Sequence, residues 1–132
     1  MCHWDIKPEN IMFSDNFEVQ LVDFGLSKII EEEQNVMTYD GEQELIKGTS
    51  TGMTGTLLYM SPEIVKKWTR KEKFFYDPFK SDMWSLGITL YWLVTNKLPF
   101  TGDWKNVLKI LQDPNFEVKI DDNLDPWWKE IL

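Results

Sequence analysis

Short apolar runs separated by polar turns open the chain. Residues 11–13 (Ile-Met-Phe) are apolar, residues 14–16 (Ser-Asp-Asn) are turn formers, and residues 17–22 alternate apolar with polar positions. This pattern predicts a β-hairpin with its turn near residues 15 and 16. Antiparallel pairing about that turn brings Asn10 close to Asp23, so we expect two oxygen-bearing side chains to converge at the open end of the hairpin.

A longer apolar segment, residues 81–95, predicts the main helix. Its apolar side chains fall on nearly every face, which is typical of a helix that is buried all round. Ser81 is the expected N-cap of this helix. Earlier in the chain, Ser61 followed by Pro62 predicts the start of a short helix.

The other segments are less regular. Residues 26–30 are expected to form a brief strand, and residues 31–54 a long exposed loop that is acidic and then rich in Gly, Ser and Thr. Residues 68–78 also predict a loop. Residues 103–112 predict an amphipathic helix, and residues 125–132 begin a third helix. The expected fold class is therefore α+β, mainly α, with a small β-hairpin and a central buried helix.

Composition narrows the class of protein. The 132 residues are 42% hydrophobic and carry a formal net charge of −8, which fits one globular domain and disfavours nucleic acid as a partner. The single cysteine, Cys2, predicts a reducing intracellular compartment, so we expect a soluble cytoplasmic protein. The longest apolar run, residues 84–95, is too short to span a bilayer, so no membrane contact is expected.

The candidate chemistry lies near the start of the chain. Asp5, Lys7 and Asn10 fall in one polar stretch, and Asp23 closes the next apolar run. Carboxylate and amide oxygens suit magnesium, which shares its coordination with substrate phosphates, so the pattern indicates phosphoryl transfer from a nucleotide. The alternative is that these are ordinary turn residues. Either group alone favours that alternative, but two groups joined by a hairpin disfavour it.

Four motifs in order resemble the eukaryotic protein kinase family. Residues 3–10 (His-Trp-Asp-Ile-Lys-Pro-Glu-Asn) are similar to its catalytic loop and residues 23–25 (Asp-Phe-Gly) to its metal-binding turn. Residues 61–63 (Ser-Pro-Glu) are similar to the end of its activation segment, or activation loop. Residues 82–87 are similar to the start of its central helix. The resemblance covers the whole chain, but only the later part of the family's domain.

The resemblance implies roles for five residues. Asp5 and Lys7 would be catalytic: Asp5 would orient the attacking hydroxyl, and Lys7 would offset charge on the phosphoryl group of ATP. Asn10 and Asp23 would hold Mg²⁺ on the nucleotide phosphates. Met12 would lie beneath the adenine ring. ATP and Mg²⁺ are thus the expected cofactors.

Further matches refine the resemblance. Lys7 and Thr56 are similar to the serine/threonine branch of the family, and Thr56, Leu57, Leu58 and Tyr59 would bind the protein substrate. Residues 98–100 (Leu-Pro-Phe), together with the motifs above, look most like the calcium/calmodulin-dependent group. His3 and Phe24 match a packed column of side chains in the family.

The chain also departs from the family pattern. Trp4 stands where most members have an arginine that pairs with a phosphate on the activation segment, and an indole cannot do so. Phosphorylation of Thr49, Ser50, Thr51 or Thr54 in that segment is therefore not expected to act through a pairing at Trp4. If Glu63 is buried, it lacks the later arginine that pairs with it in the family.

By this resemblance, residues 1–132 are expected to form a partial kinase domain. We expect the C-terminal lobe from the catalytic loop onward, without the N-terminal lobe that covers ATP and without the final helix. The implied function is ATP-dependent phosphorylation of Ser or Thr on protein substrates, a transferase activity, with little or no turnover by this fragment alone. The alternative is a non-catalytic half-kinase that acts as a protein-interaction module through its uncovered apolar surface.

Overall fold

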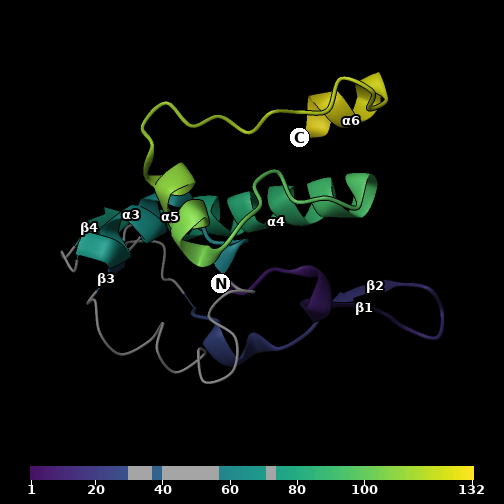
Figure 1. The fold of residues 1–132 in the computed structure, drawn as a ribbon. Coiled ribbons are helices and arrows are strands. Elements are labelled where there is room, and N and C mark those ends of the chain that lie inside the picture. Colours follow the sequence, from purple (N-terminus) through teal and green to yellow (C-terminus); the bar gives the residue numbers. More distant parts are fainter. Residues whose placement is uncertain (30–36, 40–56, 71–73) are drawn as a thin grey trace.

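The computed structural model describes residues 1–29, 37–39, 57–70 and 74–132 (Figure 1). The described part is mainly helical and contains two small antiparallel sheets, which confirms the expected balance of elements. The elements in chain order are η1 (Pro8–Asn10), β1 (Ile11–Phe13), β2 (Val19–Leu21), η2 (Phe24–Leu26), β3 (Met37–Tyr39), α3 (Pro62–Arg70), β4 (Phe74–Tyr76), α4 (Pro78–Thr95), α5 (Trp104–Gln112) and α6 (Pro126–Ile131).

The predicted hairpin is confirmed. Strands β1 and β2 pair with Ile11 opposite Leu21 and Phe13 opposite Val19. Its turn closes through a bond from the Phe17 amide to the Ser14 carbonyl, 2.9 Å, and Phe17 adopts a φ of 60°. That left-handed conformation is costly for an aromatic residue.

Helix α4 begins earlier than the sequence pattern predicts. Its N-cap is Asp77, whose side chain accepts bonds from the amides of Phe79 and Lys80, and Pro78 follows at the first helical position. The prediction of Ser81 as N-cap was wrong. Ser81 lies inside the helix and is buried, and its hydroxyl is hydrogen-bonded to the hydroxyl of Ser61 at 3.1 Å.

The prediction that this helix is buried all round was also wrong. One face is buried and is lined by Ser81, Ser85, Ile88 and Thr89. Another part of its surface is open to solvent, because Met83 is 64% and Leu93 56% exposed. The buried hydroxyls are satisfied locally; for example, Ser85 donates to the Tyr59 carbonyl at 2.7 Å.

The apolar core lies where α3, α4 and α5 meet (Figure 1). Ser61 and Pro62 do start a helix, and the Val65 amide bonds to the Ser61 carbonyl. Helix α5 is capped by the Asp103 side chain, which accepts from the Asn106 amide. The buried members of the core are Leu57, Tyr59, Val65, Ile88, Phe100, Val107 and Leu111. These contacts join the three helices into one unit.

Three irregular segments differ from expectation. Residues 26–30 contain the end of η2 and a single bridge between Cys2 and Lys28 in place of a strand. Strand β3 lies within the expected loop 31–54 and pairs with β4, which lies within the expected loop 68–78. Of the expected loop 31–54, all residues except 37–39 lie outside the described part of the chain.

The C-terminal segment crosses above α4 and ends in α6 (Figure 1). Helix α6 starts at Pro126, and the Asp125 side chain caps it by accepting from the Trp127 amide, as the sequence predicts. Glu63, in α3, is exposed, so it carries no cost of a buried unpaired charge. None of the helices in the described ranges combines the length and apolar character that crossing a membrane requires.

Candidate active site

Asp5, Lys7 and Asn10 form one hydrogen-bonded group. Lys7 Nζ lies 2.7 Å from Asp5 Oδ2, and Asn10 Nδ2 donates to the same oxygen at 3.0 Å. Asn10 Nδ2 also donates to the Asp5 main-chain carbonyl at 2.8 Å. The 3-10 turn η1 places Asn10 on the same side as Asp5, and Asn10 is buried. Both side chains are therefore held in defined orientations.

Asp23 lies at the open end of the hairpin, next to Asn10 in the register. The Val22 amide bonds to the Asn10 carbonyl at 2.9 Å, which confirms the predicted convergence of these two segments. Asp23 itself has φ 61° and ψ 70°, and its Oδ1 accepts from the Gly25 amide at 3.3 Å. This left-handed conformation is uncommon for a non-glycine residue and is typical of functional sites.

The Asp5, Asn10 and Asp23 side chains each keep one oxygen that takes no part in the bonds described above. Asp5 uses Oδ2 for the bonds above and Asp23 uses Oδ1, while Asn10 uses only its nitrogen. Each group therefore keeps one oxygen outside these bonds: Oδ1 of Asp5, Oδ1 of Asn10 and Oδ2 of Asp23. Two of these oxygens belong to a carboxylate and an amide at the hairpin end, which is a donor set that suits Mg²⁺.

The stretch before Asp5 is anchored to helix α4. The carboxylate of Asp82 accepts from the His3 amide at 2.7 Å through Oδ2 and from the Trp4 amide at 2.9 Å through Oδ1. These are charge-assisted bonds, which are stronger than neutral ones. Sequence reasoning treated Asp82 only as part of a helix motif and missed this role, because its partners lie almost 80 residues earlier in the chain.

His3 is a structural residue, as expected. It is buried, its Nε2 lies 3.0 Å from the Val22 carbonyl, and its Nδ1 accepts from the Asp5 amide at 3.3 Å. These partners select the tautomer with the proton on Nε2, since a carbonyl accepts and an amide donates. The His3 ring also packs edge-on against Phe24 at a centroid distance of 4.9 Å, so the two expected column members are in contact.

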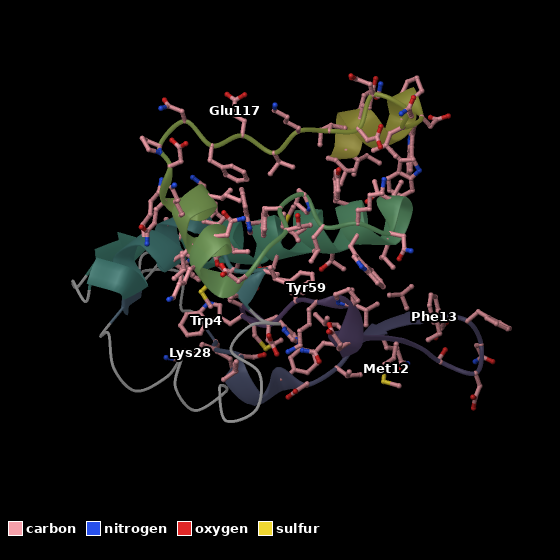
Figure 2. The ribbon with its side chains drawn as sticks, in the orientation of Figure 1. Trp4, Met12, Phe13, Lys28, Tyr59 and Glu117 are labelled. Carbon is pink, nitrogen blue, oxygen red and sulfur yellow. The ribbon has the colours of Figure 1, made fainter. Side chains whose placement is uncertain are left out.

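The chain segment after Phe24 runs back to the start of the protein. Cys2 and Lys28 exchange two main-chain bonds, of 2.8 and 3.0 Å, and the Lys28 ammonium lies 4.8 Å from the Trp4 ring centroid (Figure 2). Burial, and then the Asp82 carboxylate, raises the pKa of the Cys2 thiol to about 11. Sequence reasoning did not single out Lys28.

The other predicted site residues are dispersed. Met12 lies in β1 and is 54% exposed (Figure 2). Leu57 and Tyr59 are buried in the apolar core, whereas Leu58 is only partly buried. Burial, and then the Glu9 carboxylate, raises the pKa of Tyr59. Thr56, like the activation-segment hydroxyls Thr49 and Ser50, lies outside the described residues.

The described residues contain no cluster of His, Cys, Asp and Glu side chains large enough to hold a metal ion by itself. Within residues 1–29, 37–39, 57–70 and 74–132, no three His, Cys, Asp or Glu side chains lie close enough together to hold a metal ion. The pair Asn10 and Asp23 falls below that number. Such a pair suits an ion that takes its remaining ligands from water and phosphate, as Mg²⁺ commonly does.

Comparison with known proteins identifies the family to which the chain is similar. The family model described as protein kinase domain matches residues 1–132. The chain is 38% identical over 105 residues to calcium-dependent protein kinase 6 of Plasmodium berghei, covering 78% of this chain and 6% of that protein. It is 38% identical over 104 residues to serine/threonine-protein kinase PknL of Mycobacterium tuberculosis, covering 78% of this chain and 21% of that protein.

A third relative carries a calcium/calmodulin name. The chain is 36% identical over 114 residues to the calcium/calmodulin-dependent protein kinase kinase of Caenorhabditis elegans, which covers 85% of this chain and 18% of that protein. The chain thus spans about a fifth or less of the length of these curated relatives. Their names agree with the serine/threonine branch and the group that the motifs resemble.

Proposed function

This chain belongs to the protein kinase family, and from that premise we propose that it forms the part of a serine/threonine kinase that aligns a protein hydroxyl with the phosphates of magnesium-bound ATP. The observation that carries the proposal is the bonding of Asp5, Lys7 and Asn10, which fixes one Asp5 oxygen and leaves the other for substrate. Phosphoryl transfer depends mainly on such positioning and on charge neutralisation.

Asp5 is the proposed group that receives the substrate. Its Oδ2 is held by the Lys7 ammonium and the Asn10 amide, so the side chain cannot rotate without breaking both bonds. Oδ1 then accepts the bond from the Ser or Thr hydroxyl and orients it for attack. The fixed orientation lowers the entropy cost of bringing the reacting groups together.

Lys7 is proposed to contact the transferred group. An ammonium carries three N–H donors, and one of them is directed to Asp5. The others can donate to phosphoryl oxygens while the positive charge offsets the negative charge that develops there. Asn10 Oδ1 and Asp23 Oδ2 are the proposed magnesium ligands, and magnesium held there would supply positive charge that offsets the charge of the nucleotide phosphates.

The proposed substrate contacts come from the segment before α3. The Leu58 side chain is partly exposed, whereas Leu57 and Tyr59 are packed in the core. Their burial fixes the backbone on both sides of Leu58. We assign Leu58, with Thr56, to contact with the peptide next to the phosphoacceptor, and Met12 to the adenine ring.

Binding of Mg-ATP to the purified chain tests the proposal. We expect millimolar Mg-ATP to raise the melting temperature by about 3–5 °C at tenfold excess over Kd, and EDTA to abolish the shift. Asp23→Asn removes a proposed ligand charge and should lose the shift. Asp15→Asn, in the exposed hairpin turn, is the matched control and should keep it. A folded chain with no shift at any millimolar concentration would contradict the enzymatic proposal.

A specific observation favours a second candidate, the non-catalytic interaction module. The outer part of the hairpin exposes apolar side chains, including Phe13 at 68% and Phe17 at 87%. Apolar surface of this kind is typical of protein contacts. A folded chain whose melting temperature does not change with Mg-ATP would favour this candidate, because partner binding through the hairpin requires no nucleotide.

A further inference from the structure

Two segments that carry the acidic groups of the site are joined side by side. Residues 2–4 lead into Asp5, and residues 24–28 follow Asp23. Main-chain bonds link Cys2 with Lys28, and the Ser27 hydroxyl donates to the His3 carbonyl at 3.3 Å. We call this contact region, residues 2–4 with residues 24–28, the junction.

The side chains of Trp4 and Lys28 add a cation–π contact to the junction (Figure 2). The ammonium lies 4.8 Å from the ring centroid, within the distance at which an ammonium is attracted to an indole face. Both residues are of intermediate exposure. Partial removal of water strengthens the attraction relative to a fully exposed pair.

Trp4 directly precedes Asp5 and has an uncommon backbone conformation. Its amide bonds to Asp82, its φ is 66°, and the next residue is Asp5. A positive φ is unfavourable for a bulky residue and persists only where surrounding contacts maintain it. The ring contact with Lys28 is one such contact, and it acts one residue before the proposed catalytic carboxylate.

We propose that Lys28 and Trp4 are a positioning pair that holds the Asp5 loop against the segment after Asp23 without any phosphate. The cation of the pair is Lys28, and its counterpart is the aromatic face of Trp4. The site is thus held by residues of the chain itself. This inference rests on the proposed roles of Asp5 and Asp23.

The charge of Lys28, more than its hydrocarbon stem, is the property to test. Lys28→Met keeps an unbranched apolar stem and removes the charge, while Lys28→Arg keeps the charge and can still stack on an indole. Lys119→Met, at an exposed position between α5 and α6, is the matched control. Trp4→Leu removes the aromatic face and, combined with Lys28→Met, completes a double-mutant cycle.

Amide hydrogen exchange of the full chain measures the junction directly. We expect Lys28→Met to accelerate exchange of the His3, Trp4 and Lys28 amides about two- to fivefold, and to leave the amides of α5 unchanged. Lys28→Arg should restore the original rates. The double variant should exchange no faster than the faster single variant, because each single change already removes the same contact.

Two results would overturn the proposal. Exchange in Lys28→Met equal to that in Lys119→Met would show that the contact holds nothing. Equal acceleration in Lys28→Met and Lys28→Arg would assign the effect to shape instead of charge. Both comparisons use only substitutions at Lys28 and Lys119, so they can be made even if Trp4→Leu fails to fold.

Binding of Mg-ATP separates this inference from the proposed function. Where the unmodified chain binds Mg-ATP, we expect Lys28→Met to weaken binding about two- to fivefold and Lys28→Arg to retain it. Unchanged affinity together with faster exchange would overturn the positioning role. Where the unmodified chain shows no binding, the proposed function fails, and the exchange rates still decide whether Lys28 and Trp4 hold the junction.

Discussion

Buried positions in residues 57–111 are mostly apolar, whereas those in residues 1–29 are mostly polar. The helical region buries a continuous apolar cluster that includes Val65, Ile88 and Leu111. In the N-terminal region the buried residues are Cys2, His3 and Asn10, while Phe13 and Val19 are exposed. The helical region is thus stabilised by hydrophobic burial, and the N-terminal region by a small number of directed hydrogen bonds.

The difference explains how the hydrogen-bonded group around Asp5 is held in place by a stable helical region. Apolar packing is non-directional, so it fixes helices well but sets no single orientation for a carboxylate. Hydrogen bonds do set orientation, as at Asp5, but each contributes only about 1 kcal/mol net. The N-terminal region therefore depends on its bonds to α4, above all those to Asp82.

The largest expected effect comes from the apolar core. Leu111 is fully buried, so Leu111→Ala should lower the free energy of unfolding by about 3 kcal/mol through lost burial and the cavity that remains. Urea denaturation followed by far-UV circular dichroism measures this loss. Leu93→Ala, on the exposed surface of α4, is the control and should change stability by less than about 0.5 kcal/mol. Equal losses would refute the assignment of the core.

The next effect is confined to the N-terminal region. Asp82→Asn removes the charge and one of the two acceptors for the His3 and Trp4 amides, at a cost of about 2 kcal/mol. We expect hydrogen exchange to accelerate in residues 1–29 and to stay near its original rate in α5. Asp122→Asn provides the matched exposed control. An equal acceleration in α5 would show that the two regions unfold as one unit.

A stabilising change is expected in the hairpin turn. Phe17 adopts φ 60° and is almost fully exposed, so Phe17→Gly should relieve the left-handed backbone and stabilise the hairpin by about 1 kcal/mol. Phe17→Ala keeps the backbone cost and removes the ring, which makes it the matched control. Exchange of the β2 amides reports the result, and a gain in the alanine variant alone would contradict this explanation.

The smallest effect is expected on the exposed hairpin face. Phe13→Thr retains a residue that favours strands and removes 68%-exposed apolar surface, so the free energy of unfolding should change by less than about 0.5 kcal/mol. Thermal unfolding measures the change. A loss as large as that of Leu111→Ala would mean that this face is packed in solution, and the contrast between the two regions would fail.

The sequence was most informative where the signal is local. Alternation and turn residues located the hairpin, and Pro62, Asp103 and Asp125 marked helix starts within a residue. Ser81 misled because a serine before an apolar run is typical of a cap, whereas Asp77 followed by Pro78 provides a better cap four residues earlier. The partial exposure of α4 could not be predicted, because an all-round apolar pattern gives no information about which neighbours are present.

The candidate site shows the same limit. Spacing predicted that Asn10 and Asp23 converge, since a hairpin fixes its own register. No local pattern connects Asp82 with His3, and none connects Lys28 with Trp4. Both contacts depend on the tertiary path of the chain. The orientation of the Asp5 oxygens likewise depends on a side-chain bond that spacing does not specify.

The thiol of Cys2 can serve as a probe for opening of the N-terminal region. It is the sole cysteine of the sequence, it is fully buried, and its main chain is bonded to Lys28. Its pKa of about 11 keeps it almost entirely protonated at neutral pH, and its burial keeps a thiol-specific dye away from it in the closed structure. The labelling rate of the unmodified chain therefore reports how often the N-terminal region opens enough to expose this thiol.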